Sequence, residues 1–225
     1  MTRGYTKNAA GSVLIRTGGT VVLCTACWKK GVPAWKAGQG SGWVTAEYDM
    51  LPGATTERRE RHRTSIDGRT QEIQRLIGRS LRSVVDLTRL GENSILIDCD
   101  VLQADGGTRT SSITGAYVAL GDAVRLALHR KWITHSPILD RVAAVSVGRI
   151  RGRLLLDLDY QEDAAAEVDM NVVMTGSGRL VEVQGTGESA TFTRRELDRM
   201  LALAARGIKR LLAAQESVLR RRVRP

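Results

Sequence analysis

Apolar and polar positions in the first fifty residues predict a β-hairpin followed by a further strand. Residues 12–16 and 20–27 are rich in β-forming residues, and Gly18 and Gly19 lie between them. Two glycines between two such runs are a hairpin signal. Residues 29–42 contain glycine, lysine and one proline, which is typical of a loop, and residues 43–48 have the composition of another short strand.

Two later segments have the apolar spacing of helices. Between residues 69 and 90, apolar side chains recur at intervals of three and four from Ile73 onward, which predicts an amphipathic helix. The apolar run at residues 95–97 predicts a strand, and two glycines separate it from a second periodic segment that begins at Thr108. The stretch from residue 53 to residue 68 is charged and has no apolar period, so we expect a loop there.

The second half of the chain repeats this order of strands followed by a helix. Residues 142–150 and 153–160 predict a hairpin, and residues 168–174 and 179–184 predict a second strand pair. Thr193 and Glu196 have the spacing of a capping box at the start of a final helix. Two strand-rich blocks, each followed by a helix, indicate the α+β class, with two similar halves in one domain.

Composition limits the functional class. The chain has 225 residues and a net charge of +10, with a pI near 10.1, so we expect it to bind a polyanion such as nucleic acid. Aromatic residues make up only 4%, so backbone phosphates are a more suitable target than extensive base stacking. A basic proteome from a GC-rich genome is the alternative explanation of the charge.

The same sequence predicts a cytoplasmic protein with no membrane contact. No apolar run approaches the ~20 residues of a membrane span, and the first residues lack the apolar segment of a secretory signal. Three cysteines, an odd number, argue for a reducing compartment. Cys24 and Cys27 have C-x-x-C spacing, but they lie in a strand-like run and point to opposite faces, so we interpret them as structural.

The predicted strand, glycine turn and helix around residue 107 suggest a phosphate site. Gly107, Thr108 and Arg109 place backbone N–H groups, a hydroxyl and a guanidinium at one helix start. Such an N-terminus carries unpaired donors and partial positive charge, which suit an anion. An ordinary strand-to-helix connection is the alternative. Arg69 lies at the start of the preceding helix, after a loop with four arginines in residues 57–63, and is a further candidate anion ligand.

An acidic segment is unusual in so basic a chain. Four carboxylates, which belong to Glu162, Asp163, Glu167 and Asp169, fall within eight residues. Carboxylates near a phosphate site can bind Mg²⁺ or transfer protons. The alternative is a solvated acidic turn that balances neighbouring arginines.

Extended motifs give the chain a family resemblance. They comprise Gly11-Ser-Val-Leu, Val22-Leu-Cys-Thr-Ala, Gly42-Trp-Val-Thr-Ala-Glu-Tyr48, Met50-Leu-Pro, residues 68–79, residues 98–110, residues 162–174 and Glu182-Val-Gln-Gly-Thr186. On these residues the chain resembles the ribonuclease PH family, which comprises phosphate-dependent 3′-to-5′ exoribonucleases that trim tRNA precursors. The resemblance covers almost the whole chain. It implies one ribonuclease PH domain over residues 1–225, with halves 1–140 and 141–225 and with helices between and outside mixed sheets.

The resemblance also assigns roles to residues. It implies that inorganic phosphate, the co-substrate, contacts Arg69, Gly107, Thr108 and Arg109. It implies that Asp163 and Asp169 are catalytic, as a general acid or as ligands of Mg²⁺, and that Arg58 and Arg61 contact tRNA. It further implies release of nucleoside diphosphates, a possible reverse addition of nucleotides, and a homohexamer built as a trimer of dimers. The alternative function is a non-catalytic RNA-binding subunit of an exosome-like ring, which would be expected to lose these arginines or aspartates.

Two positions depart from the family pattern. The family usually has arginine directly after M-L-P, where this chain has Gly53, so one expected tRNA contact is in question. The family's initial segment, with a D-G-R motif, is also absent before Thr2. We expect either a start assigned too late or the lack of an edge strand.

Overall fold

The N-terminal half forms a five-stranded sheet in the computed structural model, which describes residues 1–60 and 66–221. Its strands are β1 (Thr2–Arg3), β2 (Gly11–Thr17), β3 (Thr20–Lys30), β4 (Trp43–Met50) and β5 (Asn93–Gln103), in the spatial order β1-β2-β3-β5-β4. Only the β4–β5 pair is parallel among these neighbours. The predicted hairpin is confirmed, because β2 and β3 pair from Thr17 and Thr20 outward.

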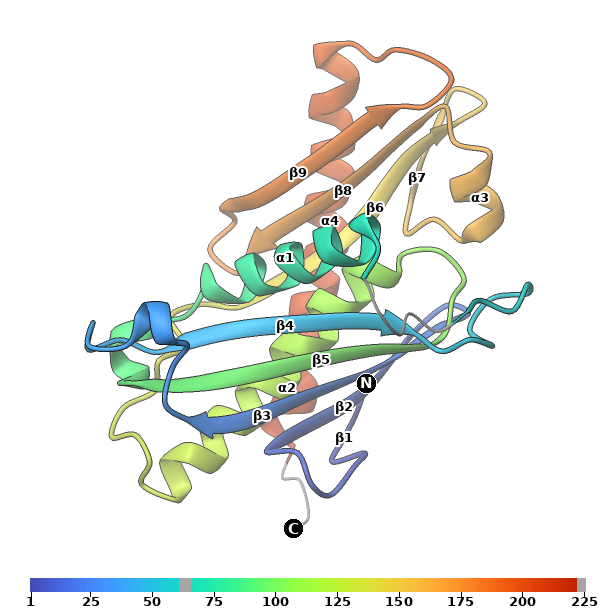
Figure 1. Ribbon diagram of the computed structural model, residues 1–225. Helices are drawn as coiled ribbons and strands as arrows, with labels where there is room; N and C mark the ends of the chain where they lie inside the picture. The colour runs from blue at the N-terminus through green and yellow to red at the C-terminus, as the bar shows by residue number, and fades with distance from the viewer. Residues whose placement is uncertain (61–65, 222–225) are drawn as a thin grey trace.

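Two helices, α1 (Gly68–Arg82) and α2 (Thr108–His129), pack against this sheet (Figure 1). The short 3-10 helices η1 (Ala34–Lys36) and η2 (Leu87–Leu90) lie in connecting segments. The prediction of one helix over residues 69–90 was wrong, because α1 ends at Arg82. Val85 instead forms a β-bridge with Ile138, and the carbonyl of Val84 accepts the Leu139 N–H. The β-branched Val84 and Val85 therefore pair with residues 138 and 139 through their backbone instead of forming another helical turn.

The C-terminal half forms a four-stranded antiparallel sheet. Its strands are β6 (Val142–Ile150), β7 (Arg153–Leu156), β8 (Val168–Thr175) and β9 (Leu180–Gly187), in the order β7-β6-β8-β9. The predicted strand 153–160 is too long, because Asp157 has a positive φ of 63° and its N–H donates to Ser146. Asp159 then caps the short helix α3 (Tyr160–Ala164) in a capping box with Glu162.

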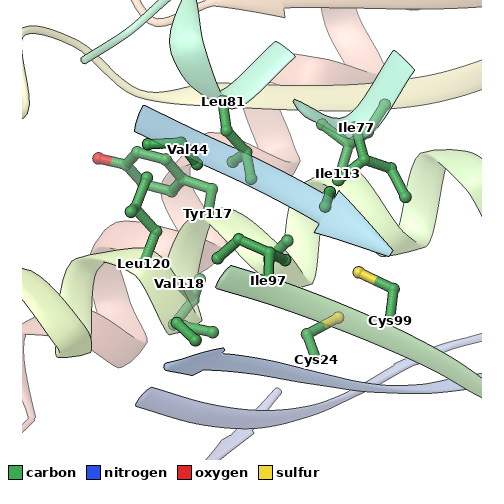
Figure 2. Close-up of a cluster of buried hydrophobic side chains, with 14 of the residues drawn as sticks. Cys24, Val44, Ile77, Leu81, Ile97, Cys99, Ile113, Tyr117, Val118 and Leu120 are labelled. Carbon is green, nitrogen blue, oxygen red and sulfur yellow. The ribbon is translucent and has the colours of Figure 1, made fainter. Parts of the chain in front are cut away.

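Helix α2 lies between the two sheets and forms the centre of the core (Figure 1). It contacts β2 and β3 on one side and β6 and α4 on the other, and nearly every residue from Thr108 to Leu120 is buried. A helix that is covered all round needs no polar face. Figure 2 shows Ile113 and Tyr117 of α2 among apolar side chains from the sheet and α1.

The final helix, α4 (Arg194–Arg220), covers the outer face of the second sheet. Its predicted capping box is confirmed. The Thr193 hydroxyl accepts a hydrogen bond from the Glu196 N–H, and the Glu196 carboxylate accepts one from the Thr193 N–H. Met200, Ala204 and Ile208 form its buried stripe against β6 and β8. None of the described helices, α4 included, has the length and apolarity that crossing a membrane requires.

The cysteines lie in the first sheet as free thiols. Cys24 and Cys99 are buried opposite each other on β3 and β5, whereas Cys27 is half-exposed on the other face. The hydrogen bond with Cys24 and complete burial raise the pKa of the Cys99 thiol well above its usual value. Within residues 1–60 and 66–221 there is no group of three or more Cys, His, Asp or Glu that could hold a metal ion.

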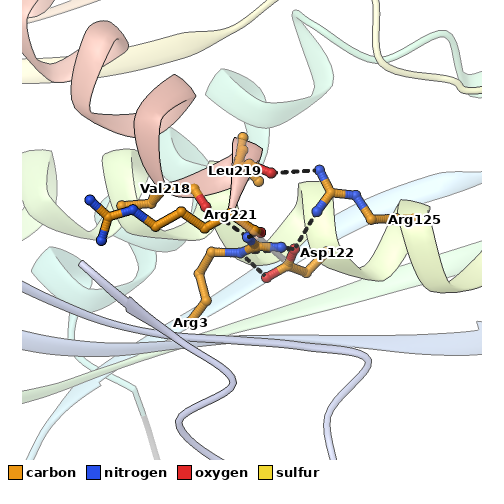
Figure 3. Close-up of polar contacts among 6 residues, drawn as sticks. All are labelled: Arg3, Asp122, Arg125, Val218, Leu219 and Arg221. Atoms are coloured by element: carbon orange, nitrogen blue, oxygen red, sulfur yellow. Dashed lines mark hydrogen bonds and ion pairs between the residues drawn. The ribbon is translucent and has the colours of Figure 1, made fainter. Parts of the chain in front are cut away.

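A polar network connects the first strand to α2 and to the C-terminal end of α4 (Figure 3). Arg3 of β1 forms a largely buried ion pair with Asp122 of α2. Its Nη1 also donates to the carbonyls of Val218 and Arg221, at 2.7 and 2.6 Å. Because the charge of Arg3 is fully paired, its burial at the sheet edge is tolerated.

Candidate active site

A cavity of about 1100 Å³ lies between the two halves of the fold. The structure brings together there all the residues that were predicted for phosphate and catalysis. From the first half they are Arg69, Gly107, Thr108 and Arg109, and from the second half they are Asp163 and Asp169. Three separate parts of the sequence, around residues 69, 107–109 and 163–169, therefore meet at one site.

The glycine turn before α2 forms one wall of this cavity. Gly106 and Gly107 have φ values of 71° and 53°, which favour glycine. A Cβ on Gly106 would lie 2.2 Å from the carbonyl oxygen of Leu158, so the turn packs directly against the second half. Gly107 is the N-cap residue of α2, and the first N–H groups of that helix lie at the cavity.

Thr108 is oriented by a buried tyrosine. The hydroxyl of Tyr48, on β4, donates to Thr108 Oγ1 at 2.8 Å. Burial raises the pKa of Tyr48 to about 12, so the tyrosine stays protonated as a donor at neutral pH. Because Thr108 Oγ1 accepts this bond, its own proton can be donated to an anion in the cavity.

Arg109 is held by side chains from both halves. Its Nη1 donates to Gln184 Oε1 of β9 at 3.0 Å and lies 3.4 Å from Glu72 Oε1 of α1. The amide nitrogen of Gln184 donates to Glu72 and Glu182, both at 2.9 Å. Sequence reasoning assigned no role to Gln184, although it lies in the E-V-Q-G-T segment.

The two aspartates differ in environment. Asp169 of β8 is half-buried, and burial together with the neighbouring Asp163 raises its pKa to about 6, against the opposing charge of Arg109. Its Oδ1 is buried and has no hydrogen-bond partner in the part of the chain that the structure describes. Asp163, on α3, is exposed. Glu167 is held by Arg149 at 2.8 Å and is not among the cavity residues.

The pair of carboxylates fits a divalent cation better than the cysteines do. Mg²⁺ is commonly held by one or two carboxylates, and water and substrate phosphates complete its shell. Asp169 has a buried Oδ1 without a hydrogen-bond partner among the described residues and a neighbouring carboxylate, Asp163, that raises its pKa, and a cation stabilises such a pair of like charges.

The basic loop is only partly described. Arg58 is exposed and does not line the cavity, and Arg61 lies outside the described residues, as does His62. Arg59, which was not selected from the sequence, lines the cavity, and its Nη2 lies 3.5 Å from Asp67 Oδ2. The signal that would have found it is its place in the same arginine-rich run.

Comparisons with known proteins show the family of the chain. Residues 1–125 match the model of the 3′ exoribonuclease family, domain 1, and residues 140–207 match domain 2. Ribonuclease PH of Corynebacterium glutamicum is 58% identical over 97% of this chain and 90% of that protein. Ribonuclease PH of Corynebacterium efficiens is 59% identical over the same shares.

A solved structure supports the fold. The exosome of Archaeoglobus fulgidus, with RNA bound to its active site, matches with a TM-score of 0.78 at 19% identity, over 93% of this chain and 84% of that chain. The family models, the curated relatives and this fold lead to one conclusion. The chain belongs to the 3′ exoribonuclease family, among the ribonuclease PH proteins.

Proposed function

We propose that the cavity between the two sheets is the site at which this phosphorolytic 3′ exoribonuclease cleaves tRNA precursors. The observation that carries the proposal is that Arg109, at the N-terminus of α2, and Asp169 line one cavity. The guanidinium of Arg109 suits inorganic phosphate. The carboxylate of Asp169 suits the leaving oxygen of the phosphodiester that phosphate attacks. A non-catalytic RNA-binding subunit would have no use for both groups in the same cavity.

The reaction has to bring two anions together. A phosphate oxygen forms a bond to the phosphorus of the terminal nucleotide, and the bond from that phosphorus to the preceding 3′ oxygen breaks. Two unit charges ~4 Å apart repel by about 4 kcal/mol at an effective dielectric constant of 20. Arg69, Arg109, the Thr108 hydroxyl and the N-terminus of α2 offset this repulsion and align the attack.

The leaving 3′ oxygen develops negative charge near the aspartates. Asp163 and Asp169 would hold Mg²⁺, which when bound supplies positive charge to that oxygen. Asp169 has to be ionised for this role, so activity falls as the pH drops through the pKa of Asp169, which is about 6 without metal and lower when Mg²⁺ is bound. Proton donation by Asp169 is the alternative role, and it predicts the opposite pH dependence.

The reaction type is tested by the products. We expect a tRNA precursor with a 3′ extension to release nucleoside diphosphates when inorganic phosphate is present, and nothing when sulfate replaces it at equal ionic strength. With excess nucleoside diphosphate and no phosphate, the reverse addition lengthens the RNA. Release of nucleoside monophosphates without phosphate would indicate hydrolysis and contradict the proposal.

RNA contact outside the cavity and assembly belong to the same proposal. Arg58 and Arg61 bind the tRNA backbone, and six copies gather these loops into one positive surface, which raises the effective concentration of contacts. The likeness to a solved exosome structure supports assembly into a ring, which we propose is a homohexamer. Light scattering should give a molecular mass six times the 24.6 kDa of one chain. A stable, active monomer would contradict the ring.

We propose the cytoplasm as the location, because the three cysteines are free thiols and so fit a reducing compartment. Tagged protein that separates with the cytoplasmic fraction would agree with this location.

A further inference from the structure

An exposed tyrosine stands at the edge of the cavity without a role in the chemistry above. Tyr160 lines the cavity and is 66% exposed. Among the described residues that line this cavity it is the only aromatic one. A single exposed aromatic side chain is ordinary on a protein surface, but this one lines the cavity that holds the phosphate-binding and acidic residues, where its ring is free to contact the base of a bound nucleotide.

The backbone of Tyr160 is fixed to the phosphate-binding turn. Its N–H donates to Asp105 Oδ1 at 3.2 Å, immediately before Gly106 and Gly107. The capping box of Asp159 and Glu162 sets the first turn of α3, and Gly106 lies directly against Leu158. The tyrosine therefore keeps a defined position relative to Thr108 and Arg109.

Tyr160 also shares a helix with one of the aspartates. It precedes Asp163 by three residues, so the two side chains lie on the same side of α3, with Cβ atoms about 5–6 Å apart. An RNA end whose terminal phosphodiester lies near Asp163 brings the attached base within reach of the ring. This step rests on the function proposed above.

We propose that the ring of Tyr160 stacks on the base of the 3′-terminal nucleotide and so positions the RNA end for cleavage. Stacking accepts every base, because each base has an aromatic face. An exonuclease that shortens RNA of mixed sequence needs this kind of contact, since hydrogen bonds to base edges would favour one nucleotide over another.

The test combines two variants with a substrate that lacks the terminal base. We expect Tyr160→Ala to raise KM for a short RNA about tenfold or more, with KM for phosphate unchanged, and Tyr160→Phe to stay near the wild-type value. For the wild-type enzyme, KM should rise by the same factor when the RNA has an abasic 3′-terminal nucleotide. For Tyr160→Ala, KM should be the same on abasic and normal RNA. Tyr5→Ala, which changes a tyrosine 51% exposed and outside the cavity, is the matched control.

Three results would overturn the inference. An unchanged KM for RNA in Tyr160→Ala would show that Tyr160 makes no such contact. An equal loss on normal and abasic RNA would mean that the ring supports the fold of α3, and thermal unfolding of each variant would show this directly. A loss in Tyr160→Phe as large as in Tyr160→Ala would assign the effect to the hydroxyl. In each case, continued release of nucleoside diphosphates that requires phosphate would leave the proposed function intact.

Discussion

Arg109→Ala should abolish phosphorolysis while RNA affinity remains largely intact. We expect activity to fall by about 10³-fold or more, the range in which single arginines stabilise phosphoryl transfer. Arg109, at the N-terminus of α2, is held in place by Gln184 and Glu72, so it presents a preorganised charge to the attacking phosphate. RNA affinity, in contrast, is distributed over many basic side chains and changes little.

Single-turnover cleavage and filter binding of a tRNA precursor measure the two effects separately. Arg109→Lys should also be poorly tolerated, because a point charge replaces a planar fork that holds Gln184 and phosphate together. Arg206→Ala, at an exposed position of α4, is the control for the loss of one positive charge. If affinity and activity fall together in Arg109→Ala, the assignment to phosphate is wrong.

Asp169→Asn should lower turnover by about 10²-fold or more and at the same time stabilise the fold. The amide keeps the size of the side chain but removes the charge that either proposed role requires. Burial and Asp163 raise the pKa of Asp169 to about 6, so its ionisation costs the folded state stability. That cost is absent below pH ~4, grows as the pH rises toward 6, and is fully present above it.

The stability gain is measured as Tm in EDTA, so that no cation compensates the charge. We expect the variant to unfold about 2–4 °C above the wild type at pH 7.5, and the difference to vanish below pH ~4. Near-normal turnover of Asp169→Asn with Mg²⁺ present would mean that the acidic cluster is merely structural.

The pH dependence of the wild type separates the two roles of Asp169. If the ionised carboxylate acts with Mg²⁺, kcat increases as the pH rises through the pKa of Asp169, which the bound cation lowers from its metal-free value of about 6. If the protonated carboxyl donates to the leaving oxygen, kcat decreases as the pH rises through the pKa of Asp169. Asp169→Asn should lack this transition in both cases.

Local signals in the sequence were sufficient for most of the fold. The glycine pair at 18 and 19 predicted the first hairpin, and Thr193 with Glu196 predicted the start of α4, because both signals act within a few residues. The ends of α1 and β7 were missed, since they depend on distant partners. Val85 leaves the helix to meet Ile138, and Asp157 turns the chain where its N–H meets Ser146.

In the site, too, residues with local sequence signals could be predicted, whereas contacts between distant segments could not. Residue types and family motifs predicted Arg109 and Asp169 as site residues, and in the structure both line one cavity. Gln184 was missed because it lies 75 residues from Arg109 along the chain and reaches it only when the two sheets pack together. No short-range pattern carries such a contact.

The contacts of Arg3 also constrain the order in which the chain can fold during synthesis. One of its hydrogen bonds spans 215 residues, from the first strand to the carbonyl of Val218 in the last turn of α4. While a ribosome still holds the end of the chain, Arg3 can reach Asp122 but not these carbonyls. The first strand can pair with β2 and reach Asp122 early, but its contacts with the last turn of α4 form only after that helix emerges and docks, so the sheet edge is fully anchored late.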